Sequence, residues 1–260
     1  MIQTEFLKSY FPPYLWNNPV RRKYMIKEYI QLLILDYLST TQYIKNIVFI
    51  GGTSLRLTKE IERFSEDLDF DCKKLSDEDF INMTDGIINF LQLFGLKAES
   101  RDKQNDKVKA FRRNIFFPEL LFELGLSGYR RERFLIKIES QDQQIDYKYK
   151  MATIKGCGLY FKFPVPKDEV MCAMKISALL SRAKGRDFYD VMFLMGQTQP
   201  DYSFLSARCG IKSQAELKQA FKNLLQKIDL SHKAKDFEHL AFQERNTRRI
   251  LLFEDFVDDL

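Results

Sequence analysis

Apolar residues in the first third of the chain recur in patterns that predict a helix, a strand, a short helix and a second strand. Residues 21–39 carry Tyr, Met and Leu side chains at three- and four-residue spacing, which is typical of an amphipathic helix. Residues 47–50 form a short apolar run that ends at a glycine pair, as in a buried strand. Thr53 or Ser54 could then cap a short helix. Residues 68–72 alternate apolar and acidic side chains, which predicts the second strand.

The rest of the chain predicts one more helix, two more strands and a helical C-terminal part. Ser76 is a candidate cap for a helix over residues 77–94. Strand patterns occur around 107–117 and over 134–140. After Pro164 and Pro166 the spacing of apolar residues becomes helical. We therefore expect two domains, 1–165 and 166–260. Helix candidates in the second are 167–183, 186–197, 213–228 (Ser213 and Glu216 forming a capping box) and 244–257.

Composition fits an ordinary water-soluble protein. Apolar residues make up 45% and charged residues 30%, and the net charge of +5 suits a polyanionic partner or a merely solvated surface. The apolar stretch 25–38 contains three charged residues, so it does not predict a membrane span. The first residues lack the pattern of a signal peptide, and the cysteines at 72, 157, 172 and 209 have no CxxC spacing. We expect a cytoplasmic protein with reduced thiols and no membrane partner.

Two aspartates in the second predicted strand are the main candidates for metal binding. Asp67 and Asp69 lie two residues apart, so their side chains share one face of the strand. Carboxylates held about 5 to 7 Å apart repel each other unless a cation lies between them. Hard oxygen ligands suit Mg²⁺ or Mn²⁺ bound to triphosphate oxygens. The alternative is an edge strand with a solvated acidic face.

The turn before this strand is suited to phosphate. Gly51 and Gly52 allow backbone amides to approach an anion closely, and a helix that starts after them would direct its positive end there. The hydroxyls of Thr53, Ser54 and Ser65 could add hydrogen bonds.

Two other motifs do not fit the sequence. No GK[ST] follows the glycines, so the turn is not a Walker A loop. Asp67, Asp69, Asp71 and Glu78 have EF-hand spacing, but Cys72 stands where the required glycine would be. Asp71 shares the acidic face but lies beyond the pair that the chemistry needs.

A third carboxylate and a lysine on a helix extend the candidate site. Glu139 ends the strand over 134–140 on the same face as Lys137, and could complete the metal site or act as a base; the alternative is an exposed glutamate. Lys175 lies beside an apolar helical stripe, where it must pair with a carboxylate or meet an anion. Asp187 and Asp190 follow one helical turn apart, so Lys175 could contact a triphosphate, form an ion pair between two helices, or both.

Four ordered blocks, GGTSLRL, RFSEDLDF, LIKIES and MKISALLSRAKGRDFYDV, together resemble the AbiEii/AbiGii toxin family of nucleotidyltransferases, which includes MenT-like toxins. The resemblance covers roughly residues 45–195 and implies an α+β fold: a polymerase-beta-like domain with a small mixed sheet and flanking helices, then a helical domain. In such families the DxD pair binds metal, the preceding serine lies at the nucleotide, and the lysine and an aspartate of the last block matter for activity. Here these are Asp67, Asp69, Ser65, Lys175 and an aspartate of the Arg186–Asp190 block.

The resemblance implies transfer of a nucleotide from an NTP, with Mg²⁺ or Mn²⁺, by the toxin of a toxin–antitoxin or abortive-infection system. The expected catalytic residues are Asp67, Asp69, Glu139, Lys175 and Asp190, with the first three as metal ligands. Arg186 and Asp187 join Gly51, Gly52, Thr53, Ser54, Ser65 and Lys175 as the expected nucleotide-binding residues.

The acceptor is the least determined part of this prediction. RNA, with tRNA as the specific candidate, fits the basic clusters Arg130–Arg131–Arg133 and Arg248–Arg249, although each cluster could be ordinary solvated charge. A cognate antitoxin is implied by the resemblance alone. The alternatives are transfer to a small molecule or a protein hydroxyl, and a non-catalytic nucleotide-binding module.

Overall fold

A computed structural model describes residues 2–73, 75–100 and 111–260. Part of the strand predicted around 107–117 therefore lies outside the described residues. The chain groups into two compact units. Unit 1 comprises Met1–Glu60, Phe64–Gln143 and Met151–Val165, and unit 2 comprises Ile61–Arg63, Gln144–Lys150 and Pro166–Leu260.

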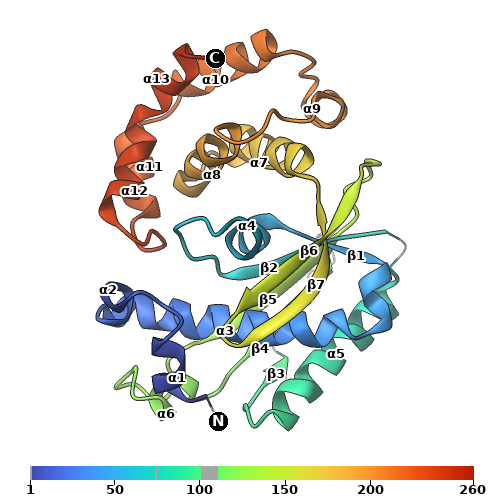
Figure 1. Cartoon of the computed structure of the whole chain (residues 1–260), viewed down its shortest axis with the longest axis vertical. Helices are drawn as coiled ribbons and strands as arrows, with labels where there is room; N and C mark the ends of the chain where they lie inside the picture. Colours follow the sequence, from blue (N-terminus) through green and yellow to red (C-terminus); the bar gives the residue numbers. More distant parts are fainter. Residues whose placement is uncertain (1, 74, 101–110) are drawn as a thin grey trace. The chain divides into compact units, whose positions relative to one another are not determined.

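The described part of unit 1 contains a five-stranded sheet with helices packed against it (Figure 1). The strand order is β1-β2-β5-β4-β3; β2 and β5 are parallel and the other pairs are antiparallel. The strands are β1 Ile47–Ile50, β2 Asp67–Cys72, β3 Glu99–Ser100, β4 Phe111–Phe116 and β5 Leu135–Gln141. The helices are α1 Thr4–Lys8, α2 Pro13–Trp16, α3 Pro19–Ser39, η1 Gln42–Lys45, α4 Gly51–Lys59, α5 Asp77–Leu93 and α6 Leu120–Glu123.

Local sequence explains where the main elements of unit 1 begin. The Asn18 side chain accepts a hydrogen bond from the backbone N–H of Val20, and Pro19 opens α3, as is favourable at the first helical position. Ser76 caps α5 with a reciprocal capping box to Asp79, which confirms the predicted cap. The expected cap at Thr53 or Ser54 is wrong, because α4 begins at Gly51 and places both residues inside the helix.

Aromatic side chains form much of the unit 1 core. Phe49 of β1 and Phe70 of β2 contact each other, and both contact Phe163, with ring centroids 5.6 to 6.0 Å apart. Such tilted and edge-on pairs stabilise a core beyond the apolar area they bury. This packing fixes the buried face of β2, and so fixes which side chains of β2 point the other way.

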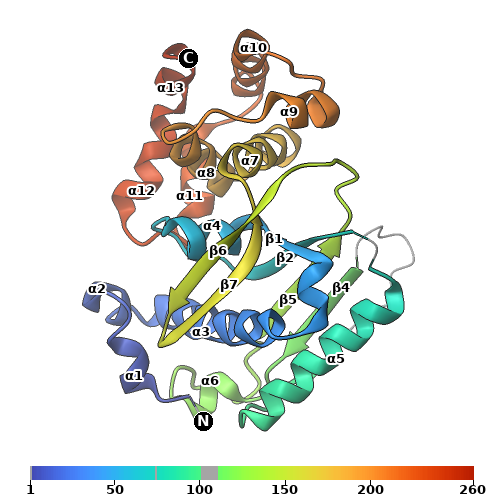
Figure 2. The ribbon, with the colours of Figure 1, turned by 45° about the vertical axis from the view of Figure 1, so that its right-hand side comes forward.

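Three strands of the structure were not predicted from the sequence: the two-residue β3, β6 and β7. β6 Tyr149–Gly156 and β7 Leu159–Pro166 form a two-stranded ribbon (Figure 2). Cys157 and Gly158 both have positive φ, as a tight hairpin turn requires. The ribbon carries the chain between the two units, since Tyr149, Lys150 and Pro166 belong to unit 2 and the rest to unit 1.

Unit 2 is helical apart from its short shares of β6 and β7. Its helices are α7 Asp168–Arg182, α8 Gly185–Met195, α9 Tyr202–Cys209, α10 Gln214–Leu225, α11 Leu230–Phe237, α12 Glu244–Arg248, η2 Arg249–Leu252 and α13 Phe253–Asp258. Ser213 caps α10 as predicted, but the Glu216 carboxylate accepts from the backbone N–H of Lys212 and not of Ser213. The single helix expected over 244–257 is instead three short ones.

Unit 2 also includes a segment distant in sequence. Arg63 forms an isolated antiparallel bridge with Ala241, and the carbonyl of Glu62 accepts hydrogen bonds from the Phe242 N–H (3.2 Å) and the Asn246 side chain (3.1 Å). Residues 61–63 are thus built into the helical unit immediately before the chain enters β2.

The predicted α+β class, with a mixed sheet, flanking helices and a helical C-terminal part, is confirmed. All four cysteines are free. None of the described helices is both long and apolar enough to cross a bilayer.

Candidate functional site

The candidate acidic face is formed by two neighbouring parallel strands. Asp67 and Asp69 of β2 alternate with buried Leu68 and Phe70, so both carboxylates lie on the partly exposed face. The register pairs Asp67 with Lys137 and Asp69 with Glu139 on β5. The expectation that Lys137 and Glu139 share a strand face is confirmed. Three carboxylates therefore lie on one face although their residues are far apart in sequence.

Two basic side chains bind these carboxylates. Lys137 Nζ lies 3.0 Å from Asp67 Oδ2 and 3.5 Å from Glu139 Oε2. Arg112 of β4 donates a hydrogen bond to Glu139. Burial alone would lower the pKa of Lys137. The negative charges of Asp67 and Glu139 have the larger effect and raise the pKa of the ammonium. The lysine therefore stays protonated and offsets part of the acidic charge.

The carboxylates fit a hard divalent cation in part. Asp67 and Asp69 present oxygen donors on one face, which is the chemistry that Mg²⁺ and Mn²⁺ prefer. Among the described residues, however, no group of three or more His, Cys, Asp or Glu side chains is arranged to hold a metal ion. Lys137 lies between Asp67 and Glu139, so a metal ligand role for Glu139 would require that ammonium to move aside.

Gly51 brings the start of α4 close to this face. Its φ is +79°, and a Cβ built on it would lie 2.2 Å from Asp69 Oδ2. Only glycine permits both the backbone conformation and this approach. The positive end of α4, a nine-residue helix, thus begins beside the Asp69 carboxylate. Gly52 follows in the first turn of α4 and is partly exposed.

The hydroxyls expected to contact phosphate are engaged elsewhere. Ser54 is fully buried and donates to the carbonyl of Phe49 at 2.9 Å, and buried Thr53 donates to the carbonyl of Asp67. Each hydroxyl ties α4 to a neighbouring strand, so we correct the expectation that Thr53 and Ser54 hold phosphate with their side chains. Ser65 is partly exposed, and its carbonyl accepts from Gln31 at 3.3 Å.

Asp71 is separate from the exposed carboxylates. It is fully buried and accepts a hydrogen bond from the backbone N–H of Gln143 at 2.9 Å. Asp71 therefore does not share the exposure of Asp67 and Asp69.

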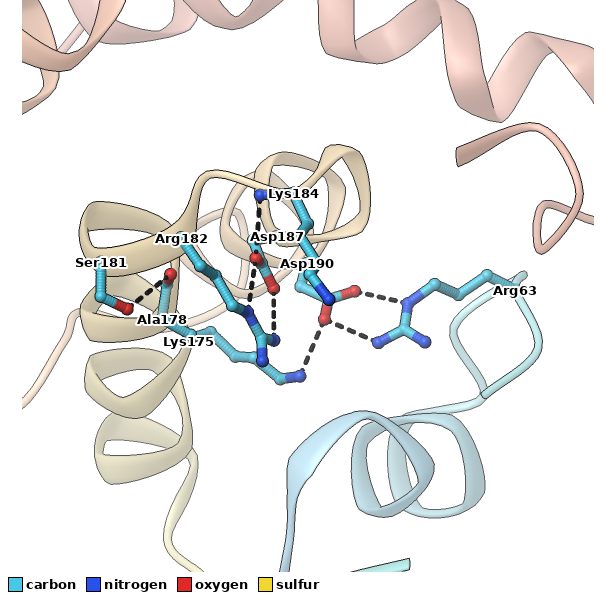
Figure 3. Close-up of polar contacts among 8 residues, drawn as sticks. All are labelled: Arg63, Lys175, Ala178, Ser181, Arg182, Lys184, Asp187 and Asp190. Carbon is cyan, nitrogen blue, oxygen red and sulfur yellow. Dashed lines mark hydrogen bonds and ion pairs between the residues drawn. The ribbon is translucent and has the colours of Figure 1, made fainter. Parts of the chain in front are cut away.

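Unit 2 contains a buried ionic network around Asp190 (Figure 3). Arg63 binds this carboxylate with two hydrogen bonds of 2.6 Å, and Lys175 Nζ lies 2.9 Å from Asp190 Oδ2. Arg63 and Asp190 are fully buried and Lys175 is 5% exposed. The predicted ion pair between the helix of Lys175 (α7) and that of Asp190 (α8) is confirmed. The sequence did not predict that Arg63 binds Asp190, because no pattern links two residues that are 127 positions apart.

A second pair extends the network. Arg182, at the end of α7, binds the buried carboxylate of Asp187 at 2.9 and 2.8 Å, and the backbone N–H of Lys184 donates to it at 3.2 Å. Asp187 thus joins the end of α7 to the start of α8. Arg186, expected at the nucleotide, is partly exposed in the first turn of α8.

The network carries more positive than negative side chains. Arg63, Lys175 and Arg182 contribute three positive charges, and Asp187 and Asp190 two negative ones. Burial alone would raise the pKa of Asp190, but the adjacent Arg63 and Lys175 outweigh burial and lower it, so this carboxylate stays ionised. Burial lowers the pKa of Lys175, with Asp190 opposing the shift and Arg63 adding to it. Arg63 already binds both oxygens of the Asp190 carboxylate, so Lys175 is the second cation on that carboxylate.

The two basic clusters belong to different units. Arg130 pairs with Glu119 at 2.7 Å, whereas Arg131 and Arg133 are exposed. In unit 2, Arg248 pairs with Glu244 at 2.6 Å and Arg249 is exposed.

Comparisons with known proteins extend this picture. A family model described as "Nucleotidyl transferase AbiEii toxin, Type IV TA system" matches residues 33–254. Similar solved structures include MenT4, a nucleotidyltransferase toxin from Mycobacterium tuberculosis H37Rv, with a TM-score of 0.62 and 17% identity over 100% of this chain and 91% of that chain. JHP933 from Helicobacter pylori has a TM-score of 0.54 and 18% identity over 91% of this chain and 92% of that chain. At these identities the structures show a shared fold. A comparison with curated proteins found no match.

Proposed function

Because the chain belongs to the AbiEii nucleotidyltransferase toxin family and is a nucleotidyltransferase, we propose that it transfers a nucleotide from an NTP to a hydroxyl of RNA, with tRNA as the specific candidate. The proposal includes dependence on Mg²⁺ or Mn²⁺ and a cognate antitoxin. The observation that carries it is the placement of Asp67, Asp69 and Glu139 on one face, with Gly51 against Asp69.

Each residue of this face has a role in the proposed reaction. Asp67 and Asp69 hold the metal–NTP complex, and the backbone amides at Gly51 and Gly52 approach its phosphates. The metal, when bound, supplies positive charge to the triphosphate and polarises the reacting phosphate. Glu139, positioned by Arg112 and Lys137, accepts the proton of the attacking hydroxyl.

The reaction is a single displacement. The acceptor oxygen forms a bond to the α-phosphorus, the bond between that phosphorus and the bridging oxygen to the β-phosphate breaks, and pyrophosphate leaves. The hydroxyl proton passes to Glu139. The charges balance without a covalent enzyme intermediate.

In unit 2 we propose that Lys175 neutralises triphosphate charge and that Asp190 positions it. Support comes from the buried cluster of Arg63, Lys175 and Asp190, which has one surplus positive charge and keeps Asp190 ionised. An anion compensates a buried surplus cation, so a triphosphate is a suitable partner for it. Arg186 and Asp187 are proposed to assist nucleotide binding, Asp187 by holding the end of α7 through Arg182.

The deciding experiment follows label from each of the four α-labelled NTPs into total RNA in the presence of Mg²⁺. We expect label in RNA with the wild type and at least a roughly 100-fold lower rate with Asp67→Ala, since metal ligands contribute several kcal/mol to such transition states. Asp77→Ala is the matched control, because Asp77 is an exposed carboxylate in the first turn of α5. Label on protein or a small molecule, with none on RNA, would refute the RNA acceptor while leaving transferase chemistry intact.

A further inference from the structure

A pocket in unit 1 lies between the first half of α3 and the starts of β2 and β5. Its volume is about 380 Å³, within the range of small-ligand sites. Lys23, Tyr24 and Lys27 line it from α3, and Arg133, Phe134 and Leu135 from the start of β5. Glu66, directly before β2, adds the one carboxylate of the lining. The residues that act in the proposed reaction do not line this pocket.

The lining combines apolar surface with positive charge. Phe134, Leu135 and the Tyr24 ring supply apolar walls. Lys27 Nζ lies 5.7 Å from the centre of the Phe134 ring and 3.4 Å from Glu66, and Arg133 is exposed. Lys27 pairs with Glu66 and Lys23 with Glu132, so exposed Arg133 is the surplus cation among these five side chains. The surplus positive charge favours an anion, and the apolar walls favour a planar ring. A nucleotide within a nucleic-acid chain combines an anionic phosphate with a planar base.

The strand register relates this pocket to the acidic face. Leu135, Lys137 and Glu139 alternate with buried residues and share the partly exposed face of β5. Lys137 is paired with Asp67, so Leu135 lies two residues before that pair, about 7 Å along the strand. Gly51 approaches Asp69 at the other end of the aspartate pair. Along the sheet, Asp67 and Asp69 therefore lie between the pocket and the turn proposed to hold phosphates.

This order matches the geometry of nucleotidyl transfer. The attacking and leaving oxygens lie roughly in line on opposite sides of the reacting phosphorus. With the leaving pyrophosphate held near Gly51, the attacking hydroxyl approaches from the side of the pocket.

We infer that this pocket binds the terminal nucleotide of the acceptor RNA, with Arg133, Lys27 and Lys23 contacting its phosphates; the inference rests on the proposed function. Binding there places a terminal hydroxyl at the Asp67 end of the aspartate pair and leaves the triphosphate side, at Asp69 and Gly51, to the NTP.

Two variants test the pocket by different means. Arg133→Glu reverses an exposed charge of the lining, and Val20→Trp, at a lining position that is 58% exposed, fills the entrance without changing charge. The matched controls are Lys162→Glu, an exposed lysine on β7, and Ile81→Trp, at a position on α5 that is 47% exposed. All four positions lie at the surface, so the folded state should tolerate the changes.

The measurements are the affinity for an RNA oligonucleotide with a free 3′ hydroxyl, by fluorescence anisotropy, and the affinity for Mg²⁺–NTP, by calorimetry. We expect both pocket variants to bind RNA at least about 10-fold more weakly, and Arg133→Glu to reduce the slope of log affinity against log salt by about 1. NTP affinity should stay within about twofold of the wild type, and the controls should match the wild type.

Unchanged RNA affinity in both pocket variants would overturn the inference. A loss of NTP affinity with RNA binding intact would also overturn it, and would assign the pocket to the nucleoside of the NTP. If the wild type neither binds nor labels RNA but transfers label to another acceptor, the RNA part of the proposed function fails and this inference fails with it. Those results are distinct, because the first two leave RNA labelling by the wild type in place.

Discussion

At the scale of single residues, Gly51 is a position that tolerates no side chain. Its φ of +79° and the 2.2 Å separation between an added Cβ and Asp69 Oδ2 leave no room for a side chain. Gly51→Ala should cost about 1 to 2 kcal/mol in the free energy of unfolding, because a Cβ is strained at positive φ. It should also displace Asp69 and lower the rate of nucleotide transfer at least about 10-fold. The measurement is the transfer rate as a function of Mg²⁺ concentration, and we expect the variant to need a different Mg²⁺ concentration from the wild type.

Gly210→Ala separates the two effects of that change. Gly210 has a φ of +73°, but nothing lies within 4 Å of its Cβ position. It should show a similar loss of stability with unchanged transfer. Equal activity in the two variants would mean that Asp69 does not depend on the space at Gly51.

Substitutions of Lys175 and of Asp190 should have different effects on the free energy of unfolding. Asp190→Asn removes the charge that Arg63 and Lys175 share, so it should destabilise the protein by about 3 to 5 kcal/mol, as removal of one partner from a buried ion pair does. Lys175→Met removes the surplus cation and leaves the bidentate Arg63–Asp190 pair in place. We expect its stability to stay within about 1 kcal/mol of the wild type or to rise.

Chemical denaturation of both variants, with NTP transfer measured in parallel, checks this prediction. Lys175→Met should be stably folded and deficient in transfer. A Lys175→Met protein that is as destabilised as Asp190→Asn, or one with normal transfer, would show that Lys175 serves only as a structural partner of Asp190.

At the scale of elements, α8 and α11 are held in close contact by a glycine. A Cβ on Gly185 would lie 2.0 Å from the carbonyl oxygen of Lys233 in α11. Gly185→Ala should therefore force the two helices apart and cost about 1 to 3 kcal/mol, as overpacking does. Gly196→Ala, at the other end of α8, has its nearest neighbour at 3.4 Å and an ordinary helical φ of −71°, so thermal unfolding should leave it near the wild type. A stable Gly185→Ala protein would contradict this account.

Sequence patterns identified the elements that have a strong apolar face. The helix over 21–39 and the strands at 47–50, 68–72 and 134–140 appear with end shifts of no more than two residues. β6 was missed because most of its residues are exposed and only Ile154 is buried, so no alternation marks it. β7 was missed because Pro164 and Pro166 suggested a boundary, whereas prolines are tolerated at the edges of a two-stranded sheet. α9 and α11 have eight residues each, too few to show a helical period.

Within the site, the same limits apply. Strand period alone placed Asp67 with Asp69, and Lys137 with Glu139, on common faces. It could not show that β5 would lie beside β2, nor that Lys137 would lie between two carboxylates, since both depend on the sheet order. The roles of Thr53 and Ser54 were misjudged because their hydroxyls bond to backbone carbonyls that only the folded chain brings near.

At the scale of the whole molecule, the helical unit is not one continuous piece of chain. It includes 61–63 and 144–150 besides Pro166–Leu260. Within it, Arg63 binds Asp190, Lys150 pairs with Asp168 at 2.7 Å, and the Tyr147 ring contacts Phe204. A fragment of residues 166–260 loses all three partners and leaves Asp190 without its bidentate arginine.

We therefore predict that fragment 166–260 does not fold on its own. Circular dichroism of the fragment should show no cooperative thermal transition, whereas the full chain should unfold cooperatively. Supplying a peptide of residues 57–67 should restore little, because the 144–150 contacts stay absent. A fragment that melts cooperatively near the temperature of the full chain would refute the prediction.

The parallel pairing of β2 with β5 also sets when a growing polypeptide can become active. Asp67 and Asp69 leave the ribosome early, but their neighbours Lys137 and Glu139 belong to a strand that pairs with β2 only after more than half of the chain has been synthesised. A nascent chain interrupted before Leu135 lacks one side of the acidic face and the strand on which the acceptor pocket begins. On the proposed mechanism, an incomplete product of this toxin-family enzyme should therefore be inert in the cell that makes it.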